Sequence, residues 1–479
     1  MILRVINHPY EFDMKNLCIT FFPHEKIRLE GEEDPVVVTT RRETDGSFFV
    51  SAKVYDVYRE TTAKPEPADE EHLVLSVTLY RLLSGILGFA PPWGVLYGVR
   101  PAKLMHRLCA QMGDDVAVAH FQTAFLTQKS KAELAHEVML HENRSIARSG
   151  PKSFSLYVSI PFCPTRCAYC SFVSHSIEKT HKLMTPYVDL LLRELEETSK
   201  YAKELGLELA TVYFGGGTPT TLSAQDLGRI FSTIEQNFDL SHLMEYTVEA
   251  GRPDTVTQER LEVIHAAGVQ RISINPQSFN DKVLEAIGRR HTAQQTLDAF
   301  ALARDCGFDH INMDFIAGLP EDDLPSFQRS IQTALDLQAE SITVHTLALK
   351  TSAYMVTREQ TFDLKDRLTV SNMVDYDGQT LHGAGYYPYY MYRQSKSLGN
   401  LENVGWCKPG YDCLYNVYMM DETHTVLAVG AGAVTKLRGQ NSGMIERIYN
   451  YKYPYEYIRD FDTLLERKKR IPGFYAEYD

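Results

Sequence analysis

The sequence lacks the long hydrophobic segments and the leader that would direct a chain into or across a membrane. No uninterrupted apolar run reaches about 18 residues, the length needed to span a bilayer. The first residues, Met1–Pro9, contain no basic stretch followed by an apolar stretch and a cleavage site, so no secretory signal is expected. We therefore expect a cytoplasmic protein that does not enter a membrane.

Cysteine and clustered positive charge are also scarce. The chain has 8 cysteines in 479 residues, and only Cys163, Cys167 and Cys170 cluster, so a disulfide framework is not expected. The formal net charge is −13, and the longest basic run, Arg467–Arg470, is typical of a solvated helix end. Binding to nucleic acid through phosphate neutralisation is therefore not expected.

Length and composition indicate a folded protein of two or three domains. Residues 1–150 are predicted to form an N-terminal α+β accessory domain, and residues 351–479 a C-terminal α+β domain that covers the substrate. The aromatic run Tyr386–Tyr392 fits a flat ligand site, but packing in a strand or core is favoured because aromatic residues are enriched in strands. The strand-like stretches of the first region are Ile2–Ile6, Val36–Thr40 and Phe48–Tyr55.

Residues 151–350 alternate between short β-branched or aromatic runs and helical patterns. Helix starts are predicted at the Thr185–Pro186 pair, at Ser223 and at Thr255, which with Gln258 matches a capping box. Because the runs are apolar throughout, both faces of each strand are expected to be covered, as in a parallel sheet. This pattern predicts an α/β fold, a partial (β/α)6 barrel. Its six strands are Leu156–Ile160, Thr211–Phe214, Tyr246–Glu249, Arg271–Asn275, Ile311–Phe315 and Ile342–His345.

The three clustered cysteines follow the first of these strands, on a loop where parallel α/β sheets place their active sites. Three thiolates can hold three irons of a 4Fe–4S cluster and leave the fourth iron open to another ligand. A zinc site would need a fourth ligand, for which His175 is an awkward candidate. A redox pair would use only Cys167 and Cys170 and leave Cys163 unexplained.

The CxxxCxxC spacing, with Tyr169 before the last cysteine, resembles the signature of the radical S-adenosylmethionine (SAM) family. In that family the open iron binds SAM, and an electron from the cluster cleaves SAM to a 5′-deoxyadenosyl radical. The second strand ends in Gly215–Thr220, and this glycine run resembles the family's motif for the SAM amino group. The resemblance implies a radical SAM core domain over residues 151–350, with a 4Fe–4S cluster and SAM as cofactors.

Within this family, the segment Tyr157–Cys163 is similar to the lead-in of the oxygen-independent coproporphyrinogen III oxidase branch. That branch implies a second SAM bound near Gln277, Arg289, Asp314 and Ala348. Without the resemblance, Arg289 and Asp314 would be taken as an ordinary ion pair. The SAM contacts implied by the resemblance are Tyr157, Tyr169, Gly216, Gly217, Thr218, Glu249, Gln277, Arg289, Asp314 and Ala348.

Two departures separate the sequence from well-defined members of the branch. The decarboxylating enzymes have a further cysteine at the position of Phe172 in this chain. The heme chaperones (HemW) usually have phenylalanine there, as this chain does. The chaperones have a Cys-Arg-His-Asn-x-x-Tyr-Trp motif that supplies heme contacts, and the matching segment Cys413–Met420 has Tyr415, Met419 and Met420 at the positions of its His, Tyr and Trp. The long N-terminal region and the segments Asn403–Gly410 and Val429–Ala433 look most like the HemZ subfamily.

Three functions follow from this resemblance. The first is the oxidative decarboxylation of coproporphyrinogen III to protoporphyrinogen IX without oxygen, in heme biosynthesis, and the kept Gln277, Arg289 and Asp314 favour it. The second in rank is a radical SAM enzyme acting on another tetrapyrrole such as heme. The third is a heme chaperone that uses SAM structurally, which Tyr415 and Met420 disfavour. The resemblance also implies a flavodoxin or ferredoxin as electron donor, and the sequence identifies no catalytic residue.

Overall fold

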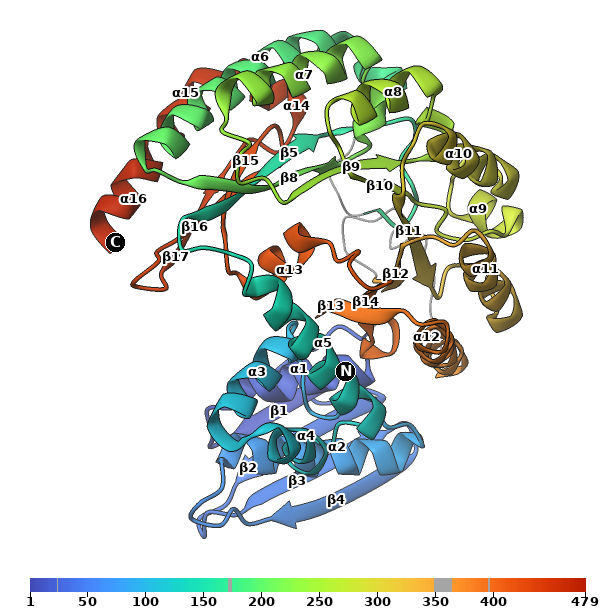
Figure 1. Ribbon diagram of the computed structural model, residues 1–479. Helices are drawn as coiled ribbons and strands as arrows, with labels where there is room; N and C mark the ends of the chain where they lie inside the picture. Colours follow the sequence, from blue (N-terminus) through green and yellow to red (C-terminus); the bar gives the residue numbers. More distant parts are fainter. Residues whose placement is uncertain (24, 171–174, 349–363, 395–396) are drawn as a thin grey trace. The chain divides into compact units, whose positions relative to one another are not determined.

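The computed structural model describes all residues except 24, 171–174, 349–363 and 395–396 (Figure 1). The chain divides into two compact units. The N-terminal unit comprises Met1–Met139, Gln360–Ser371 and Met391–Glu402, and the barrel unit comprises Leu140–Glu359, Asn372–Tyr390 and Asn403–Asp479. None of the helices in the described ranges is long and apolar enough to cross a membrane.

The N-terminal unit contains a four-stranded sheet in the order β1-β2-β3-β4. Strand β1 runs parallel to β2, and the other two pairs are antiparallel. The strands are β1 (Ile2–Ile6), β2 (Val36–Arg42), β3 (Phe48–Val54) and β4 (Val57–Ala63). The first three confirm the sequence prediction. Strand β4 was not predicted, because its side chains are almost all exposed and it carries no buried apolar face.

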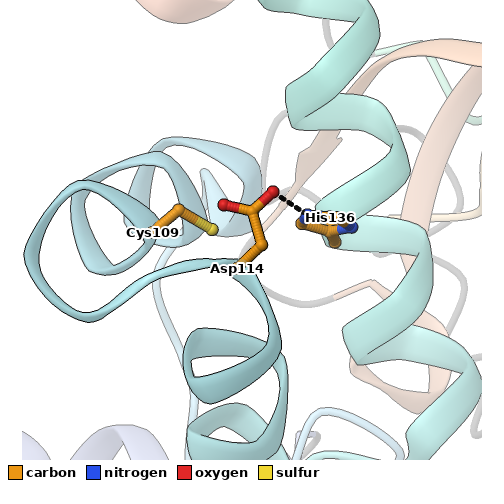
Figure 2. Close-up of side chains that lie close together, drawn as sticks. All are labelled: Cys109, Asp114 and His136. Atoms are coloured by element: carbon orange, nitrogen blue, oxygen red, sulfur yellow. Dashed lines mark hydrogen bonds and ion pairs between the residues drawn. The ribbon is translucent and has the colours of Figure 1, made fainter.

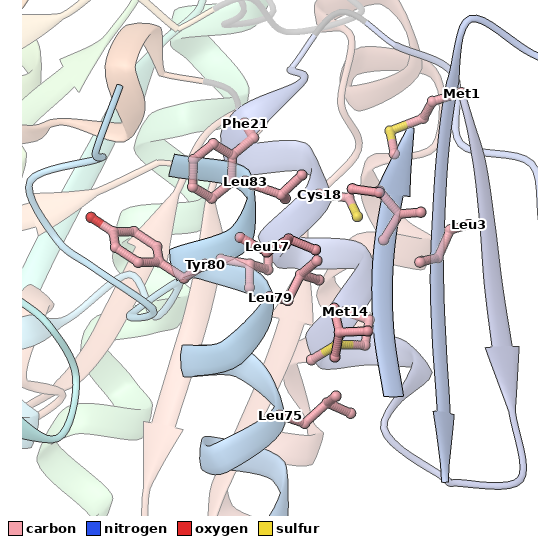
Figure 3. Close-up of a cluster of buried hydrophobic side chains, with 14 of the residues drawn as sticks. Met1, Leu3, Met14, Leu17, Cys18, Phe21, Leu75, Leu79, Tyr80 and Leu83 are labelled. Atoms are coloured by element: carbon pink, nitrogen blue, oxygen red, sulfur yellow. The ribbon is translucent and has the colours of Figure 1, made fainter. Parts of the chain in front are cut away.

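Two helices, α1 (Glu11–Phe21) and α2 (Glu71–Leu87), pack their apolar sides on this sheet. Figure 3 shows Leu17 and Phe21 of α1 beside Leu79 and Leu83 of α2. These four side chains are at most 2% exposed, so burial of their apolar surface stabilises the unit. Three further helices follow in the chain: α3 (Pro101–Met112), α4 (Asp114–Thr123) and α5 (Lys129–Ile146).

The barrel unit is built on an eleven-stranded sheet in the order β13-β14-β12-β11-β10-β9-β8-β5-β15-β16-β17. Its six central strands are parallel neighbours, which confirms the predicted partial barrel. Figure 1 shows the connecting helices along the outer side of the curved sheet and α13 on its inner side. The six strands are β5 (Ser153–Ile160), β8 (Glu208–Gly216), β9 (Glu245–Gly251), β10 (Arg271–Ile274), β11 (His310–Ala317) and β12 (Ser341–Thr346).

The connecting helices begin where polar caps satisfy their first backbone N–H groups. Ser223 caps α7 as predicted, accepting a hydrogen bond from the Asp226 backbone. The cap predicted at Thr255 is wrong, since Thr257 caps α8 instead. The start predicted at Thr185–Pro186 is also wrong, because Pro186 lies inside α6. The helices are α6 (Ile177–Glu204), α7 (Ala224–Asn237), α8 (Gln258–Ala266), α9 (Asp281–Ala286), α10 (Ala293–Asp305) and α11 (Leu324–Asp336).

Strands from residues 351–479 extend the same sheet on both sides. Strand β14 pairs antiparallel with β12, and β15 pairs parallel with β5. The aromatic run lies largely in β13, an edge strand in which Tyr389 is fully buried, as the favoured packing interpretation predicts. The strands are β13 (Tyr387–Arg393), β14 (Glu402–Cys407), β15 (Thr425–Val429), β16 (Val434–Arg438) and β17 (Ile445–Tyr449). The domain boundaries at 150 and 350 stay a prediction.

The helices of this last part are α12 (Leu364–Gly383), α13 (Leu414–Asp421), α14 (Pro454–Arg459), α15 (Phe461–Lys468) and α16 (Arg470–Tyr478). A buried ion pair joins α15 to α6. Lys468 Nζ lies 2.6 Å from Glu194 Oε1, and both side chains are 0% exposed. Glu194 also accepts hydrogen bonds from the Gly430 backbone and from Tyr457. The basic run is therefore not wholly solvated, because Lys468 is buried.

We expect Lys468→Met to destabilise the protein by about 3–5 kcal/mol, because it leaves the buried Glu194 carboxylate without its cation. The matched control is Lys469→Met, which removes an exposed 2.6 Å pair with Glu466. That change should cost less than about 1 kcal/mol. Urea denaturation of both variants measures the difference. Equal effects would contradict a structural role for the Glu194–Lys468 pair.

Candidate active site at the carboxyl ends of the parallel strands

Most of the predicted site residues lie at or after the carboxyl ends of the parallel strands, whereas Tyr157 and Asp314 lie within strands and Arg289 follows α9. The cysteine loop follows β5, and the glycine run ends β8. Glu249 lies near the end of β9, Gln277 follows β10, and Asp314 lies within β11. Because β5, β8, β9, β10 and β11 are successive neighbours in the sheet, these residues lie along one edge of it.

The cysteine loop is held against the barrel by backbone hydrogen bonds. Cys163 ends the short strand β6 (Phe162–Cys163), which pairs with β7 (His175–Ser176). The Ala168 N–H donates to the Ile287 carbonyl at 2.9 Å. Cys163 and Cys167 are each 8% exposed, and neither forms a disulfide. The loop thus places these thiols at the sheet edge without a disulfide bond among the described residues.

The three thiols are not arranged around a single metal ion. Among the described residues, one group of three or more Cys, His, Asp or Glu side chains places its ligand atoms within 4.8 Å of one another, and it contains none of these cysteines. A 4Fe–4S cluster bonds each thiolate to a different iron, so its cysteines need not converge on one point. The three convergent ligand atoms that zinc requires are therefore not found at this loop among the described residues.

Arg252, which the sequence interpretation missed, lies against this loop. Its Nη1 donates to the Thr165 hydroxyl at 2.8 Å and lies 3.9 Å from Cys167 Sγ. Asp254 holds the other side of the guanidinium through two hydrogen bonds of 2.9 Å. Arg252 is 3% exposed, so its positive charge acts on the loop with little screening by solvent. The only sequence feature that could have pointed to Arg252 is its position shortly after the end of a predicted strand.

We expect Arg252→Gln to lower the midpoint potential of the bound cluster, because a cation near a thiolate ligand favours the reduced, more negative cluster. A shift of about 60 mV corresponds to a tenfold change in a one-electron equilibrium. An EPR-monitored redox titration measures the shift. Asp254→Asn keeps the guanidinium and removes its counter-charge, so as the comparison variant it should not lower the midpoint. A midpoint equal to that of the unchanged protein would contradict an electrostatic role for Arg252.

The glycine run ends β8 close to the cysteine loop. The Gly217 N–H donates to the Ile160 carbonyl at 2.7 Å, and the Thr218 N–H donates to the Phe162 carbonyl at 2.8 Å. A side chain at Gly217 would place its Cβ 2.6 Å from the Phe162 oxygen. Gly216 has a φ of 104°, a conformation that favours glycine. Thr218 Oγ1 also lies 3.4 Å from Cys163 Sγ, so the glycine run and the cysteine loop form one site.

A second part of the site is a stack of three tyrosines beside Glu249. The ring centroids of Tyr213 and Tyr415 lie 4.4 Å apart, and Tyr157 stacks on both at about 6 Å. The Tyr213 hydroxyl donates to Glu249 Oε1 at 2.7 Å. Burial raises the pKa of Glu249 to about 7, against the lowering effect of the Tyr213 hydrogen bond. A cationic or hydroxyl-bearing ligand would therefore find a strong acceptor here.

Tyr415 is placed in this stack by Glu245, which lies beneath the start of α13. Glu245 Oε2 accepts the Leu414 N–H at 2.5 Å, and Oε1 accepts the Tyr415 N–H at 3.3 Å. A carboxylate at this position satisfies backbone donors that would otherwise have no partner. Tyr415, from the last part of the chain, thus joins the site, and the sequence interpretation did not anticipate its stacking.

The third part of the site contains Arg289. Its Nη1 donates to the Asn275 carbonyl at 2.7 Å, and its Nη2 donates to the Tyr169 hydroxyl at 3.1 Å. The backbone of Gln277 is in the left-handed region, with a φ of 67°. Its N–H donates to the Asp314 carbonyl at 2.9 Å. Such strained backbone is typical of binding sites.

The ordinary ion pair considered for Arg289 and Asp314 is wrong. Both side chains are described, and they have different partners: Asp314 accepts a hydrogen bond from Asn312 at 2.7 Å and lies 4.0 Å from His345. Burial raises the pKa of Asp314, but His345 and Asn312 outweigh that effect and leave the pKa below its usual value. Ala348 follows β12 and is half-buried, and Phe172 lies outside the described residues.

Several buried polar atoms at this edge of the sheet lack hydrogen-bond partners in the described structure. They are Ser273 Oγ, Asn275 Oδ1 and Arg289 Nε. Since buried polar atoms are normally paired, these three are suited to a polar ligand. SAM carries an ammonium, a carboxylate and two ribose hydroxyls, which could pair with acceptors and donors of this kind. The residues present therefore fit a site for SAM beside a cluster.

Comparisons with known proteins agree with this geometry. The family profile of the radical SAM superfamily matches residues 157–334. The oxygen-independent coproporphyrinogen-III oxidase-like protein HemZ of Bacillus subtilis is 34% identical over 95% of this chain and 94% of its own length. The heme chaperone HemW of Haemophilus influenzae is 30% identical over 66% of this chain and 78% of its own length.

Among solved structures, coproporphyrinogen III oxidase (HemN) from Escherichia coli, a radical SAM enzyme, superposes with a TM-score of 0.51. It is 21% identical and covers 68% of this chain and 72% of its own, so it supports the fold alone. The radical SAM family uses a 4Fe–4S cluster and SAM, in agreement with the cofactors expected from the sequence. The chain belongs to the radical SAM superfamily and, within it, to the family of HemZ-like, oxygen-independent coproporphyrinogen III oxidase-like proteins.

Proposed function

We propose that this protein is a radical SAM oxidoreductase that converts coproporphyrinogen III to protoporphyrinogen IX without oxygen, in heme biosynthesis. The observation that carries the proposal is the polar group formed by Arg289, Asn275, Gln277 and Asp314. Arg289 contacts Tyr169 of the predicted cluster loop, and the buried Asn275 Oδ1 and Arg289 Nε have no hydrogen-bond partner in the described structure. The relative HemZ, which matches nearly the whole chain, is an oxygen-independent coproporphyrinogen-III oxidase-like protein.

In this proposal Cys163, Cys167 and Cys170 hold the 4Fe–4S cluster, and Arg252 fixes the loop that carries them. The cluster and SAM together supply a carbon radical able to remove a hydrogen atom from an unactivated C–H bond. Burial of two of the cysteines keeps water from the cluster side of the site.

A first group of side chains is assigned to SAM at the cluster. Gly216 and Gly217 let the backbone approach SAM closely, and Glu249 accepts hydrogen bonds from it. Tyr157, in the tyrosine stack, offers an aromatic face beside Glu249. The full set of proposed contacts in this group is Tyr157, Tyr169, Gly216, Gly217, Thr218 and Glu249.

A second group is assigned to a further SAM molecule or to a substrate carboxylate. Arg289 has one unpaired Nε and is 9% exposed, so it can form a charge-assisted hydrogen bond to an incoming carboxylate. Asp314 keeps its negative charge at neutral pH and suits an ammonium or a sulfonium. Gln277 and Ala348 complete this group.

The proposed reaction converts a propionate side chain of the porphyrinogen to a vinyl group, with atoms and electrons balanced as follows. Loss of a hydrogen atom from its ring-proximal CH₂, followed by loss of CO₂ and one electron, leaves a vinyl group. The electron passes to an acceptor, and a flavodoxin or ferredoxin is proposed as the donor that reduces the cluster.

A heme chaperone is the alternative that a specific observation supports, because HemW proteins are about 30% identical over some two thirds of the chain. Against it, Tyr415 is buried in the tyrosine stack and is not free to bind heme. A radical SAM enzyme acting on another tetrapyrrole would use the same residues. It would differ from the proposed enzyme only in its substrate.

The test is an anaerobic reaction of the reconstituted protein with SAM, a low-potential reductant and coproporphyrinogen III, followed by mass spectrometry. The proposal predicts loss of two CO₂ units from the porphyrinogen, with 5′-deoxyadenosine formed in step. SAM cleavage with an unchanged porphyrinogen would reject this substrate and make heme the next one to test. Tight heme binding without SAM cleavage would favour the chaperone.

A further inference from the structure

A cluster of three potential metal ligands lies in the N-terminal unit, where the sequence interpretation found no chemical motif. Cys109, Asp114 and His136 each offer one ligand atom, and these atoms lie within 4.8 Å of one another. Figure 2 shows the Cys109 sulfur pointing toward the Asp114 carboxylate, which in turn faces the His136 ring. His136 Nε2 lies 2.9 Å from Asp114 Oδ2.

The three residues are brought together by the way in which α3, α4 and α5 are joined. Cys109 lies in the last turn of α3, and Asp114 is the first residue of α4. The single residue between these helices, Gly113, has a φ of 84°, which allows the sharp change of direction. The Gly113 N–H donates to the Cys109 carbonyl at 2.9 Å. His136 reaches the pair from α5.

The donor types select the class of metal. Thiolate, imidazole and carboxylate together are typical zinc ligands, whereas magnesium and calcium prefer oxygen donors alone. A tetrahedral zinc ion with these bond lengths separates its ligand atoms by about 3.3–3.6 Å. His136 Nε2 and Asp114 Oδ2 lie 2.9 Å apart, and all three ligand atoms lie within 4.8 Å of one another. Small side-chain rotations would therefore bring them to the separations that zinc requires.

The local charges also favour a cation. A divalent ion would compensate both the thiolate and the carboxylate. The Asp114 side chain is 54% exposed and His136 is 24% exposed, so the metal would be reachable from solvent.

We propose that Cys109, Asp114 and His136 bind Zn²⁺, with a water molecule at the fourth position, and that the ion joins α3, α4 and α5. This site is separate from the Cys163–Cys170 loop and does not depend on the reaction proposed above. Three protein ligands and one exchangeable position also leave room for an anionic or thiol ligand at the metal.

The test is metal analysis of the full-length, cluster-loaded protein after incubation with equimolar zinc and removal of unbound metal. We expect about one zinc ion per chain besides about four irons. Cys109→Ala and His136→Ala should lose the zinc, with affinity roughly a hundredfold weaker or worse, and keep the iron and SAM cleavage. Cys306→Ala, which removes another partly buried free cysteine, should keep both metals.

Zinc could also bind to the cluster cysteines of a chain that has lost its cluster. To separate this from the proposed site, the Cys109 and His136 variants are repeated in a chain that also carries Cys163→Ala. Zinc that persists there but disappears with Cys109→Ala supports the site. A wild-type chain without zinc, or Cys109 and His136 variants that bind zinc as tightly as the wild type, would overturn it. Because iron content and SAM cleavage are measured separately, failure of the zinc site and failure of the proposed function give different results.

Discussion

Replacing Cys163, Cys167 or Cys170 by alanine is expected to abolish the brown absorbance of the reconstituted cluster and all SAM cleavage. Each thiolate is assigned to a different iron, so the loss of one leaves the cluster with too few protein ligands to persist. Anaerobic reconstitution followed by visible absorbance, iron analysis and quantification of 5′-deoxyadenosine measures both effects. The expected loss is complete, because SAM cleavage requires an electron from the cluster.

The matched control for these variants is Cys306→Ala. Cys306 caps the end of α10 and is a free, partly buried cysteine outside the cluster loop. It should keep the absorbance, the iron and the activity of the unchanged protein. A variant at Cys163, Cys167 or Cys170 that retained a 4Fe–4S spectrum and cleaved SAM would refute the assignment of the cluster ligands.

Arg289→Gln and Asp314→Asn are expected to reduce substrate turnover by roughly a hundredfold or more while sparing uncoupled SAM cleavage. Each change would remove the proposed charge-assisted contact to a second SAM or to the substrate, a loss of about 3 kcal/mol. Arg289 contacts Tyr169 and the Asn275 carbonyl, and Asp314 contacts Asn312 and His345. Product formation and 5′-deoxyadenosine formation are measured in the same reaction.

The control is Arg290→Gln, which changes the next residue in the chain. Arg290 forms an exposed pair with Glu178 at 2.8 Å and does not belong to the proposed site. It should leave both readouts unchanged. An equal loss of turnover and SAM cleavage in the Arg289 and Asp314 variants would indicate that these residues only maintain the fold.

The barrel could be predicted from the sequence because its signals are local. The six parallel strands are continuous apolar runs, and their ends coincide with the cysteine and glycine motifs. Strand β15 was missed because nothing in a short run such as Thr425–Val429 indicates that it will pair with β5, some 270 positions earlier in the chain. Partner choice between distant strands is a tertiary property that propensity does not determine.

Helix starts and buried charges illustrate the same limit. Pro186 matches the first position of a helix, yet α6 begins at Ile177 and passes through it, so tertiary packing outweighs the missing backbone donor. Lys468 belongs to a basic run that resembles a solvated helix end. Its burial depends on Glu194, which is supplied by a helix far away in the sequence.

The sequence predicts site residues that belong to a recognisable motif. It does not predict residues that reach the site only through the folding of the chain. The roles given to the cysteines, the glycine run, Glu249, Gln277, Arg289 and Asp314 rest on sequence motifs and stay predictions. The placement of Arg252 beside Cys167 was not predicted, because one arginine after a strand has many ordinary explanations. The stack of Tyr415 on Tyr213 depends on Glu245 and α13, which meet only in the folded chain.

The most direct test of the account is an anaerobic reaction with coproporphyrinogen III carrying deuterium on the ring-proximal carbons of its propionates. The proposed reaction transfers deuterium to 5′-deoxyadenosine while the porphyrinogen loses two CO₂ units, because the hydrogen atom removed comes from those carbons. Unlabelled 5′-deoxyadenosine together with an unchanged porphyrinogen would contradict it. That outcome would keep the radical SAM chemistry and remove coproporphyrinogen III as the substrate.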